Sequence, residues 1–195
     1  MNTETNDWFI RLYCSVSRWL GLLTASLGLL VLAGWAMHWP LLLQLAPRYS
    51  PMTPWTAVCF ILCGVSLLSS QEPSRKAFSF LRIACTSLVF LFSLIPLCEY
   101  LFHISIGTDT LLFGAALRDL MPAMPGRMSP PSVVGFLLSA IALATINTKS
   151  CRGNNPSQCF ALLVGVVALL GVIGYAYGVP GFYQFSWYKP MALHT

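Results

Sequence analysis

The sequence predicts an all-α membrane protein with five transmembrane helices, arranged as repeated helix-loop-helix hairpins. Three observations support this fold class: a high apolar content, long stretches without charged residues, and a short phrase that occurs three times. Hydrophobic residues make up 56% of the 195 residues and charged residues only 9%, whereas soluble domains carry about a quarter charged residues. In a lipid bilayer the backbone must satisfy its own hydrogen bonds, which favours helices.

The repeated phrase, called here the Met phrase, places a methionine four residues before a Thr or Ser. It reads Met-Thr-Pro-Trp-Thr at residues 52–56, Met-Ser-Pro-Pro-Ser at 128–132 and Met-Ala-Leu-His-Thr at 191–195. The apolar stretch before each phrase ends in an aromatic residue, namely Trp35, Tyr100 and Tyr175. Repeated units of this kind pack against one another. We expect repeat 1 at residues 19–70, repeat 2 at 77–148 and a partial repeat 3 at 159–195.

Five apolar stretches predict membrane-spanning helices. Four of them contain no Asp, Glu, Lys or Arg: residues 19–37, 52–70, 128–148 and 159–177. Each is close to the ~20 residues that a helix needs to cross a ~30 Å hydrocarbon core. In the fifth, Arg82 and Glu99 bracket sixteen uncharged residues. We expect this helix to begin near Ala77, with the Arg82 side chain reaching the membrane surface from within it.

Basic residues predict the orientation. Residues 1–17 are polar and predict a cytoplasmic N-terminal tail, followed by the transmembrane repeat domain over residues 18–195. Seven of the eleven Lys and Arg lie on the same predicted side, in residues 11–18, 75–82 and 149–152. Cytoplasmic loops carry the excess of basic residues, so the N-terminus is predicted inside and the three Met phrases outside. After five crossings the C-terminus is also outside, and a sixth helix is missing.

Most of the chain from residue 19 onward resembles a bacterial N-terminal membrane module found ahead of PAS domains, sensor histidine kinases and GGDEF diguanylate cyclases. The residues that carry the resemblance are Gly-Trp at 34–35, Met-Thr-Pro-x-Thr-Ala from Met52, Glu-Tyr at 99–100, Gly-Arg-Met-Ser-Pro at 126–130 and Gly-Tyr at 174–175. The resemblance implies a non-catalytic sensory or anchoring input module in the bacterial inner membrane. Two departures are the missing sixth helix and Pro131-Ser132, where the family has Asn-Thr.

The Met phrase has the residues of a helix start. Thr53 and Ser129 are preferred N-caps, and the proline after each has no N–H for the first turn to leave unpaired. Helix N-termini also carry partial positive charge, so three of them at one membrane face suggest a site for a small polar or anionic ligand. Both interpretations, simple capping and a ligand site, remain open. The site hypothesis takes Thr56, Ser132 and His194 from the three phrases.

Glu99 stands where the other two repeats have Gly34 and Gly174, directly before the aromatic residue. A carboxylate at the membrane edge suggests a functional site, and the alternative is an interfacial Glu that reaches water. His103 follows one turn later and would pair with Glu99 if the helix continues; otherwise it is an exposed loop residue. The candidate ligand-binding residues are therefore Glu99, Tyr100, His103, Tyr175, Thr56, Ser132 and His194.

The longest connection, residues 104–126, has no counterpart in the other repeats. Within residues 110–120 the apolar side chains recur at helical spacing, which predicts a short helix on the outer surface, either a lid or an interfacial anchor. The side chains expected on its buried face are Leu111, Leu112, Ala115 and Leu120.

The sequence contains no catalytic motif, so we do not expect an enzyme. A copper or haem site was considered because three histidines and three methionines fall on the predicted outer side: His38, His103, His194, Met52, Met128 and Met191. No helix carries paired histidines, and methionine is a common apolar filler, so we predict no metal and no cofactor.

The net charge of +5 is dispersed, which argues against nucleic-acid binding. The expected surroundings are the lipid bilayer, and the expected partners are a second copy of the chain or a cytoplasmic output domain downstream. The alternative function is a stand-alone small bundle that binds a lipid, a quinone or a partner subunit.

Overall fold

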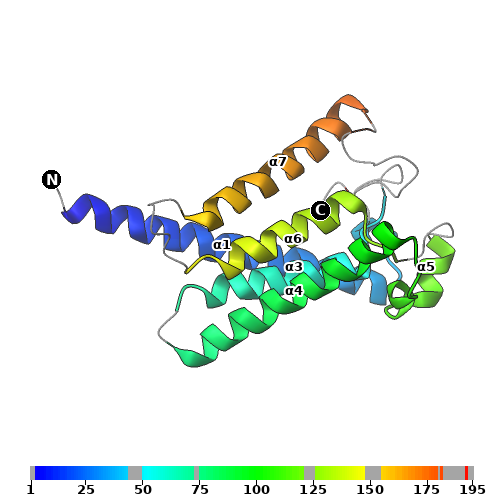
Figure 1. The fold of residues 1–195 in the computed structure, drawn as a ribbon, viewed down its shortest axis with the longest axis horizontal. Helices are drawn as coiled ribbons and strands as arrows, with labels where there is room; N and C mark the ends of the chain where they lie inside the picture. The colour runs from blue at the N-terminus through cyan, green and yellow to red at the C-terminus, as the bar shows by residue number, and fades with distance from the viewer. Residues whose placement is uncertain are drawn as a thin grey trace.

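The computed structural model describes residues 3–43, 50–72, 75–120, 126–147, 155–179, 181 and 192. Within these residues the chain forms helices and no strand (Figure 1). In chain order they are α1 (Thr3–Ala36), α2 (Pro40–Leu43), α3 (Pro54–Ser69), α4 (Lys76–Phe102), the 3₁₀ turn η1 (Thr108–Thr110), α5 (Gly114–Leu120), α6 (Pro130–Ala144) and α7 (Pro156–Tyr177). The prediction of an all-α chain is confirmed for the described residues.

Three helices are long and apolar enough to cross a membrane, in agreement with a membrane protein. They are the Leu12–Ala36 part of α1, together with α4 and α7. The helices α3 and α6 are also apolar, but they contain only 16 and 15 residues. At 1.5 Å per residue this gives about 22–24 Å, less than a ~30 Å hydrocarbon core. The count of five transmembrane helices therefore stays a prediction.

The first helix is longer than the first predicted span. It contains 34 residues, and its N-terminal part projects past the other helices (Figure 1). Residues 3–17, expected as a polar tail, are helical and continuous with the apolar Leu12–Ala36 segment. No helix boundary occurs at residue 18.

The helix α3 lies in the middle of the bundle, where α1, α4 and α6 pack against it. The contact between α1 and α3 is a close approach of two backbones. A β carbon at Gly28 would lie 2.5 Å from the carbonyl oxygen of Ala57, and one at Gly64 would lie 2.6 Å from that of Gly21. Only glycine permits this approach, a common device in membrane helix bundles.

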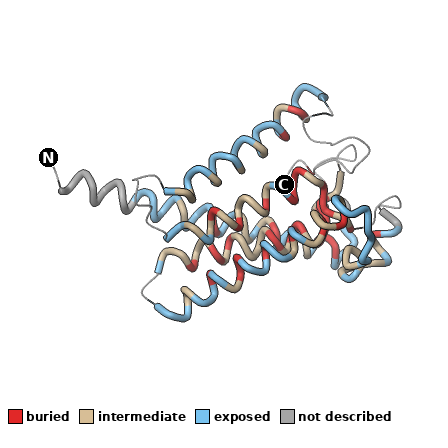
Figure 2. The backbone as a smooth tube through the Cα atoms, viewed as in Figure 1, coloured by how far each residue is buried: buried red, intermediate tan, exposed pale blue. Residues whose placement is uncertain are grey.

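Burial is uneven across the bundle (Figure 2). Buried residues recur along α3, α4 and α6, which pack against one another. The helix α7 packs on α6 and is exposed along most of its length, and among its residues only Gly171 and Gly174 are buried. The apolar surface of α7 is suited to contact with lipid.

The helices α3 and α6 start at the Met phrases as predicted, but only Thr53 caps its helix through its side chain, because Ser129 forms no side-chain cap hydrogen bond. A proline occupies the first turn of each, after Thr53 and Ser129 as N-caps. The Oγ1 atoms of Thr53 and Thr56 lie 2.8 Å apart in a hydrogen bond, and the hydroxyls of Ser129 and Ser132 lie 2.7 Å apart in another. The Thr53 hydroxyl also accepts a hydrogen bond from the Thr56 backbone N–H at 3.4 Å. All four side chains are buried.

The ends of α1, α4 and α7 also follow one pattern. Each has a left-handed residue three positions after its aromatic: His38 with φ 53°, His103 with φ 54° and Gly178 with φ 65°. At α1 the backbone N–H of Trp39 donates to the carbonyl of Gly34 at 2.9 Å. At α7 the N–H of Val179 donates to the carbonyl of Gly174 at 2.8 Å. Both are the six-residue closure of a Schellman cap.

Arg82 lies inside α4, as predicted, since that helix begins at Lys76. Its side chain differs from the prediction, because Arg82 is only 9% exposed and its Nη1 donates to the carbonyl oxygen of Leu143 at 3.1 Å. Leu143 is in the last turn of α6, where carbonyl groups lack helical partners and the helix dipole favours a cation. Arg82 therefore fastens α4 to the end of α6.

The helix predicted over residues 110–120 is shorter in the structure. After η1 the chain turns through Phe113, whose φ is 56°, and α5 begins only at Gly114. Leu117 is fully buried, whereas Leu111, expected on the buried face, is 73% exposed, and the burial of Leu120 is outside what the structure describes. The left-handed Phe113 breaks the helix and changes which face is inside.

Candidate ligand site where α3, α4 and α6 meet

Glu99 is the most buried charged residue at the junction, with its side chain fully covered. It lies in the last turn of α4, and its Oε1 accepts a hydrogen bond from the backbone N–H of Ile106 at 2.9 Å. Its Oε2 lies 3.1 Å from Nη2 of Arg127, an ion pair, although no hydrogen bond of good geometry reaches this oxygen. Glu99 thus contacts the connection between α4 and α6 near its start, at Ile106, and near its end, at Arg127.

Arg127 joins the two halves of this charged cluster. Its Nε donates to Oδ2 of Asp109 at 3.0 Å, and its guanidinium lies 5.5 Å from the centre of the Tyr100 ring, a cation–π contact. The Tyr100 hydroxyl donates to the carbonyl oxygen of Met128. The side chains of Arg127 and Asp109 are only 15% and 13% exposed, so these contacts are largely shielded from water.

The charges in this cluster do not balance, because two carboxylates face one guanidinium. Burial raises the pKa of the Asp109 carboxyl above its ordinary value; the hydrogen bond from Arg127 lowers it, and the nearby charge of Glu99 raises it further. Burial lowers the pKa of Arg127, but its hydrogen bond to Asp109 and the charges of both carboxylates raise it by more. The guanidinium stays charged, and burial makes the Asp109 anion less stable than that of an exposed aspartate.

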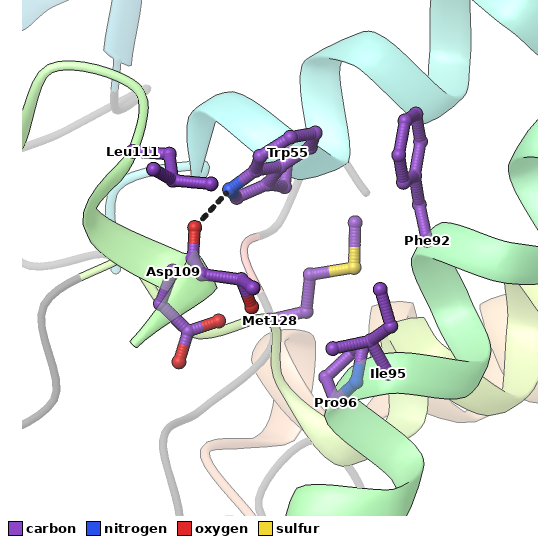
Figure 3. A pocket seen from close by; sticks show the side chains of 8 residues that line it. Trp55, Phe92, Ile95, Pro96, Asp109, Leu111 and Met128 are labelled. Atoms are coloured by element: carbon purple, nitrogen blue, oxygen red, sulfur yellow. Dashed lines mark hydrogen bonds between the residues drawn. The ribbon is translucent and has the colours of Figure 1, made fainter. Parts of the chain in front are cut away.

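A cavity of about 180 Å³, called here the Asp109 cavity, lies beside the cluster. Figure 3 shows its wall, which is mostly apolar and includes two aromatic rings. Trp55 Nε1 donates to the carbonyl oxygen of Thr108 at 3.1 Å, which holds η1 against α3. The rings of Trp55 and Phe92 lie 4.9 Å apart between centres, tilted by 54°. The lining residues are Trp55, Phe92, Ile95, Pro96, Thr108, Asp109, Leu111 and Met128.

A second cavity, of about 150 Å³, lies among α1, α3, α6 and α7. Ser132 lines it together with Thr24, Cys63 and Ser139. The hydroxyls of Thr24 and Ser139 donate to backbone carbonyls within their own helices, those of Leu20 and Gly135. These two hydroxyl groups therefore have no free donor hydrogen to offer a ligand in this cavity.

The structure brings together two of the seven predicted site residues, Glu99 and Tyr100. Thr56 and Ser132 are buried in the helix starts, bonded to Thr53 and Ser129. Tyr175 is half-buried in α7, and His194 lies outside the described residues. His103 does not extend the helix toward Glu99, because it is the exposed left-handed cap at which α4 ends.

Sequence reasoning missed Arg127 and Asp109, the partners of Glu99 and of each other. A signal was present, since Asp109 lies inside the 104–126 connection that the other repeats lack and Arg127 directly follows it. It also missed Trp55 and Phe92 as cavity residues, because aromatic residues are common at helix starts and in helix interiors.

Among the described residues no group of three His, Cys, Asp or Glu is placed to hold a metal ion. No family model, no curated protein and no solved structure matches this chain. The site consists of an apolar, aromatic cavity bounded on one side by a buried cluster with two carboxylates and one guanidinium.

Proposed function

We propose that this chain is the transmembrane sensory input module of a bacterial signalling protein, and that it binds a small molecule in the Asp109 cavity. The construction of the cavity carries this proposal, because its wall comes from α3, α4, η1 and Met128 just before α6. An occupant touches four segments that are far apart in the sequence. A ligand shifts a conformational equilibrium only through unequal contacts with the two states, and such contacts are available here.

The helix α4 has a weak point beside the cavity, which supports a role in signalling. Pro96 lies inside the helix and lines the cavity. Proline has no N–H to donate to the carbonyl four residues earlier, that of Phe92, so one helical hydrogen bond is missing. Phe92 lines the same cavity, so an occupant contacts α4 where it bends at the lowest cost.

The proposed direction of signalling is from outside to inside. The distribution of basic residues supports a cytoplasmic N-terminus, with the Asp109 cavity near the outer surface and Arg82 near the cytoplasm. A downstream output domain of the kind that follows the resembled modules would receive the change from the cytoplasmic ends of the helices. In a cysteine-free background, Ile104→Cys should react with an impermeant thiol reagent in intact cells and Glu72→Cys should not. The opposite labelling pattern would refute this orientation.

We also propose that the hairpins are structural repeats and that α3 and α6 cross the membrane. Trp35 donates from Nε1 to the carbonyl of Met52 at 3.0 Å, and Tyr100 donates to that of Met128. These bonds join the aromatic helix end to the Met phrase in both units. The third phrase, with Met191, lies outside the described residues. Local thinning of the bilayer accommodates apolar helices of about 22–24 Å at modest cost.

A second candidate function is a stand-alone bundle that binds a lipid chain or a quinone. The cavity of about 150 Å³ among four helices favours it, because its wall is mostly apolar and Ser132 and Ser139 add hydroxyl groups. In this case the cluster of Glu99, Arg127 and Asp109 would only stabilise the connection between α4 and α6. The two functions therefore differ in whether Glu99 affects a signal.

A reporter fusion tests the proposed function. The full chain is joined to a cytoplasmic diguanylate cyclase domain, and cyclic dinucleotide output is measured at equal membrane abundance. Glu99→Gln should change the output, because it removes one charge from the cluster beside the cavity while keeping the side chain's shape. The matched control is Glu72→Gln, whose carboxylate is exposed and pairs with Arg75 far from the cavity. Equal output from the original fusion and Glu99→Gln would refute the sensory role.

A further inference from the structure

We propose that the Asp109 cavity binds a small organic cation of the quaternary ammonium class, with the cationic group against the aromatic wall on the side where Asp109 lines the cavity. This inference rests on the proposed function for its biological meaning, and it names the chemical class of the ligand. It draws on three independent features of the described residues: the charge of the cluster, the composition of the wall and the volume of the cavity.

The charge of the cluster calls for a cation. Glu99 and Asp109 are both shielded from water, and among the described residues Arg127 is the only basic side chain that pairs with either. One negative charge therefore lacks a partner in a region of low dielectric, where an unpaired charge is costly. Asp109 lines the cavity whereas Glu99 does not. A cation in the cavity would therefore lie nearer to Asp109 than to Glu99.

The wall of the cavity selects an organic cation over a metal ion. Calcium and magnesium require six or more oxygen ligands, but the residues lining this cavity are mainly apolar or aromatic. The faces of Trp and Phe attract ammonium groups through the ring quadrupole, which is the usual basis of quaternary ammonium recognition. Trp55 is held in place by its bond to Thr108, and Met128 adds a polarisable thioether.

The volume of about 180 Å³ accommodates one ammonium head group with a short chain. The cavity is therefore suited to a molecule such as choline, which is the probe for the experiment. Its uncharged carbon isostere, in which the quaternary nitrogen is replaced by carbon, has almost the same shape. Comparing the two on the unmodified protein isolates the contribution of the charge.

Titration calorimetry on the full chain in nanodiscs tests the proposal. Choline should bind saturably, and the isostere at least about tenfold more weakly, since it lacks the attraction to Asp109 and to the ring. Asp109→Asn should reduce choline affinity by about tenfold or more, and Asp109→Glu should retain most of it. Glu72→Gln is the matched control and should bind as the unmodified chain does.

Acidification supplies a further readout. The groups facing Asp109 are Arg127 ahead of α6 and Glu99 from α4, with the Tyr100 ring across the guanidinium. Burial raises the pKa of the Asp109 carboxyl, so its anion is lost at a higher pH than that of an exposed aspartate. Choline affinity should therefore fall as the pH is lowered through this raised pKa. The affinity of Asp109→Asn should show no such step.

Equal affinity for choline and its isostere would overturn the cation assignment and leave a neutral apolar ligand. Absence of choline binding would also overturn it. Neither result depends on the variants folding, because both use the unmodified chain. Calorimetry needs no output domain, so binding of choline with an unresponsive reporter would refute the sensory role alone. A responsive Glu99 reporter without choline binding would refute only the ligand class.

Discussion

The ends of α1 and α4 have the same backbone design but different chemistry. At α1, Trp35 donates to the carbonyl of Met52 at 3.0 Å. At α4, Tyr100 donates to the carbonyl of Met128. Both helices stop at a left-handed histidine three residues after the aromatic, and both methionines are 1% exposed.

The difference lies at the position before the aromatic. A β carbon at Gly34 would lie 2.7 Å from Cβ of Leu42, because α2 packs against this end of α1. At α4 the equivalent residue is Glu99, whose carboxylate recruits Arg127 and, through it, Asp109. Glu99 in place of glycine, together with the longer 104–126 connection, therefore replaces an apolar packing contact with a charged cluster. The helix end and its hydrogen bond to the Met phrase are the same in both.

The largest expected effect comes from removing the cation at the α4 end. Arg127→Met should lower the free energy of unfolding by about 3–5 kcal/mol, because it leaves two carboxylates buried without a cationic partner. Arg75→Met removes an exposed ion pair with Glu72 and should cost less than about 1 kcal/mol. Denaturant unfolding in detergent measures both. Equal losses for the two variants would show that the cluster is solvated.

The next effect tests the packing contact at the α1 end. Gly34→Ala should cost about 1–3 kcal/mol, because the added methyl group overlaps Leu42. Gly165→Ala in α7 is the matched control, since a β carbon there meets nothing within 4 Å. It should be neutral or stabilising by up to about 1 kcal/mol through helix propensity. Thermal unfolding followed by circular dichroism distinguishes the two signs.

A smaller effect tests the bond shared by the two ends. Tyr100→Phe removes the hydroxyl that reaches Met128 and should cost about 0.5–1.5 kcal/mol, with the aromatic ring retained. Tyr177→Phe, at a tyrosine that is 79% exposed, is the control and should have no measurable effect. Unfolding in the same detergent provides the comparison. A neutral Tyr100→Phe would mean that this hydrogen bond contributes nothing to joining α4 to α6.

The smallest effect concerns the left-handed caps. His38→Gly and His103→Gly each relieve a conformation that costs an L-residue about 1–2 kcal/mol, but glycine gains entropy in the unfolded chain. The net stabilisation should be below about 1 kcal/mol and similar at the two sites. Differential scanning of both variants checks this. A gain at one site with a loss at the other would break the equivalence of the two helix ends.

Local rules explain what could be predicted. Thr53 and Ser129 stand at the predicted N-cap positions, because the start of a helix depends on a few neighbouring residues. The sequence leaves the full burial of Glu99 open, since an interfacial carboxylate that reaches water fits the same place in the repeat. The ion pair of Glu99 with Arg127 could not be predicted, because it closes a long connection without periodicity. The lengths of α3 and α6 were overestimated, because their predicted bounds were set by the absence of charged residues. That absence shows where a helix can lie in the membrane, but it does not show where the helical hydrogen bonds end.

The glycine contact between α1 and α3 has a consequence for how the bundle can move. Gly28 and Gly64 bring backbone against backbone, which leaves little room for either helix to shift toward the other. The helices α4 and α6 are instead tied by side chains at both ends, through Tyr100 and Arg82. Such ties can lengthen or exchange partners. The molecule thus divides into a rigid pair, which serves as a fixed reference, and an adjustable pair that can slide against it.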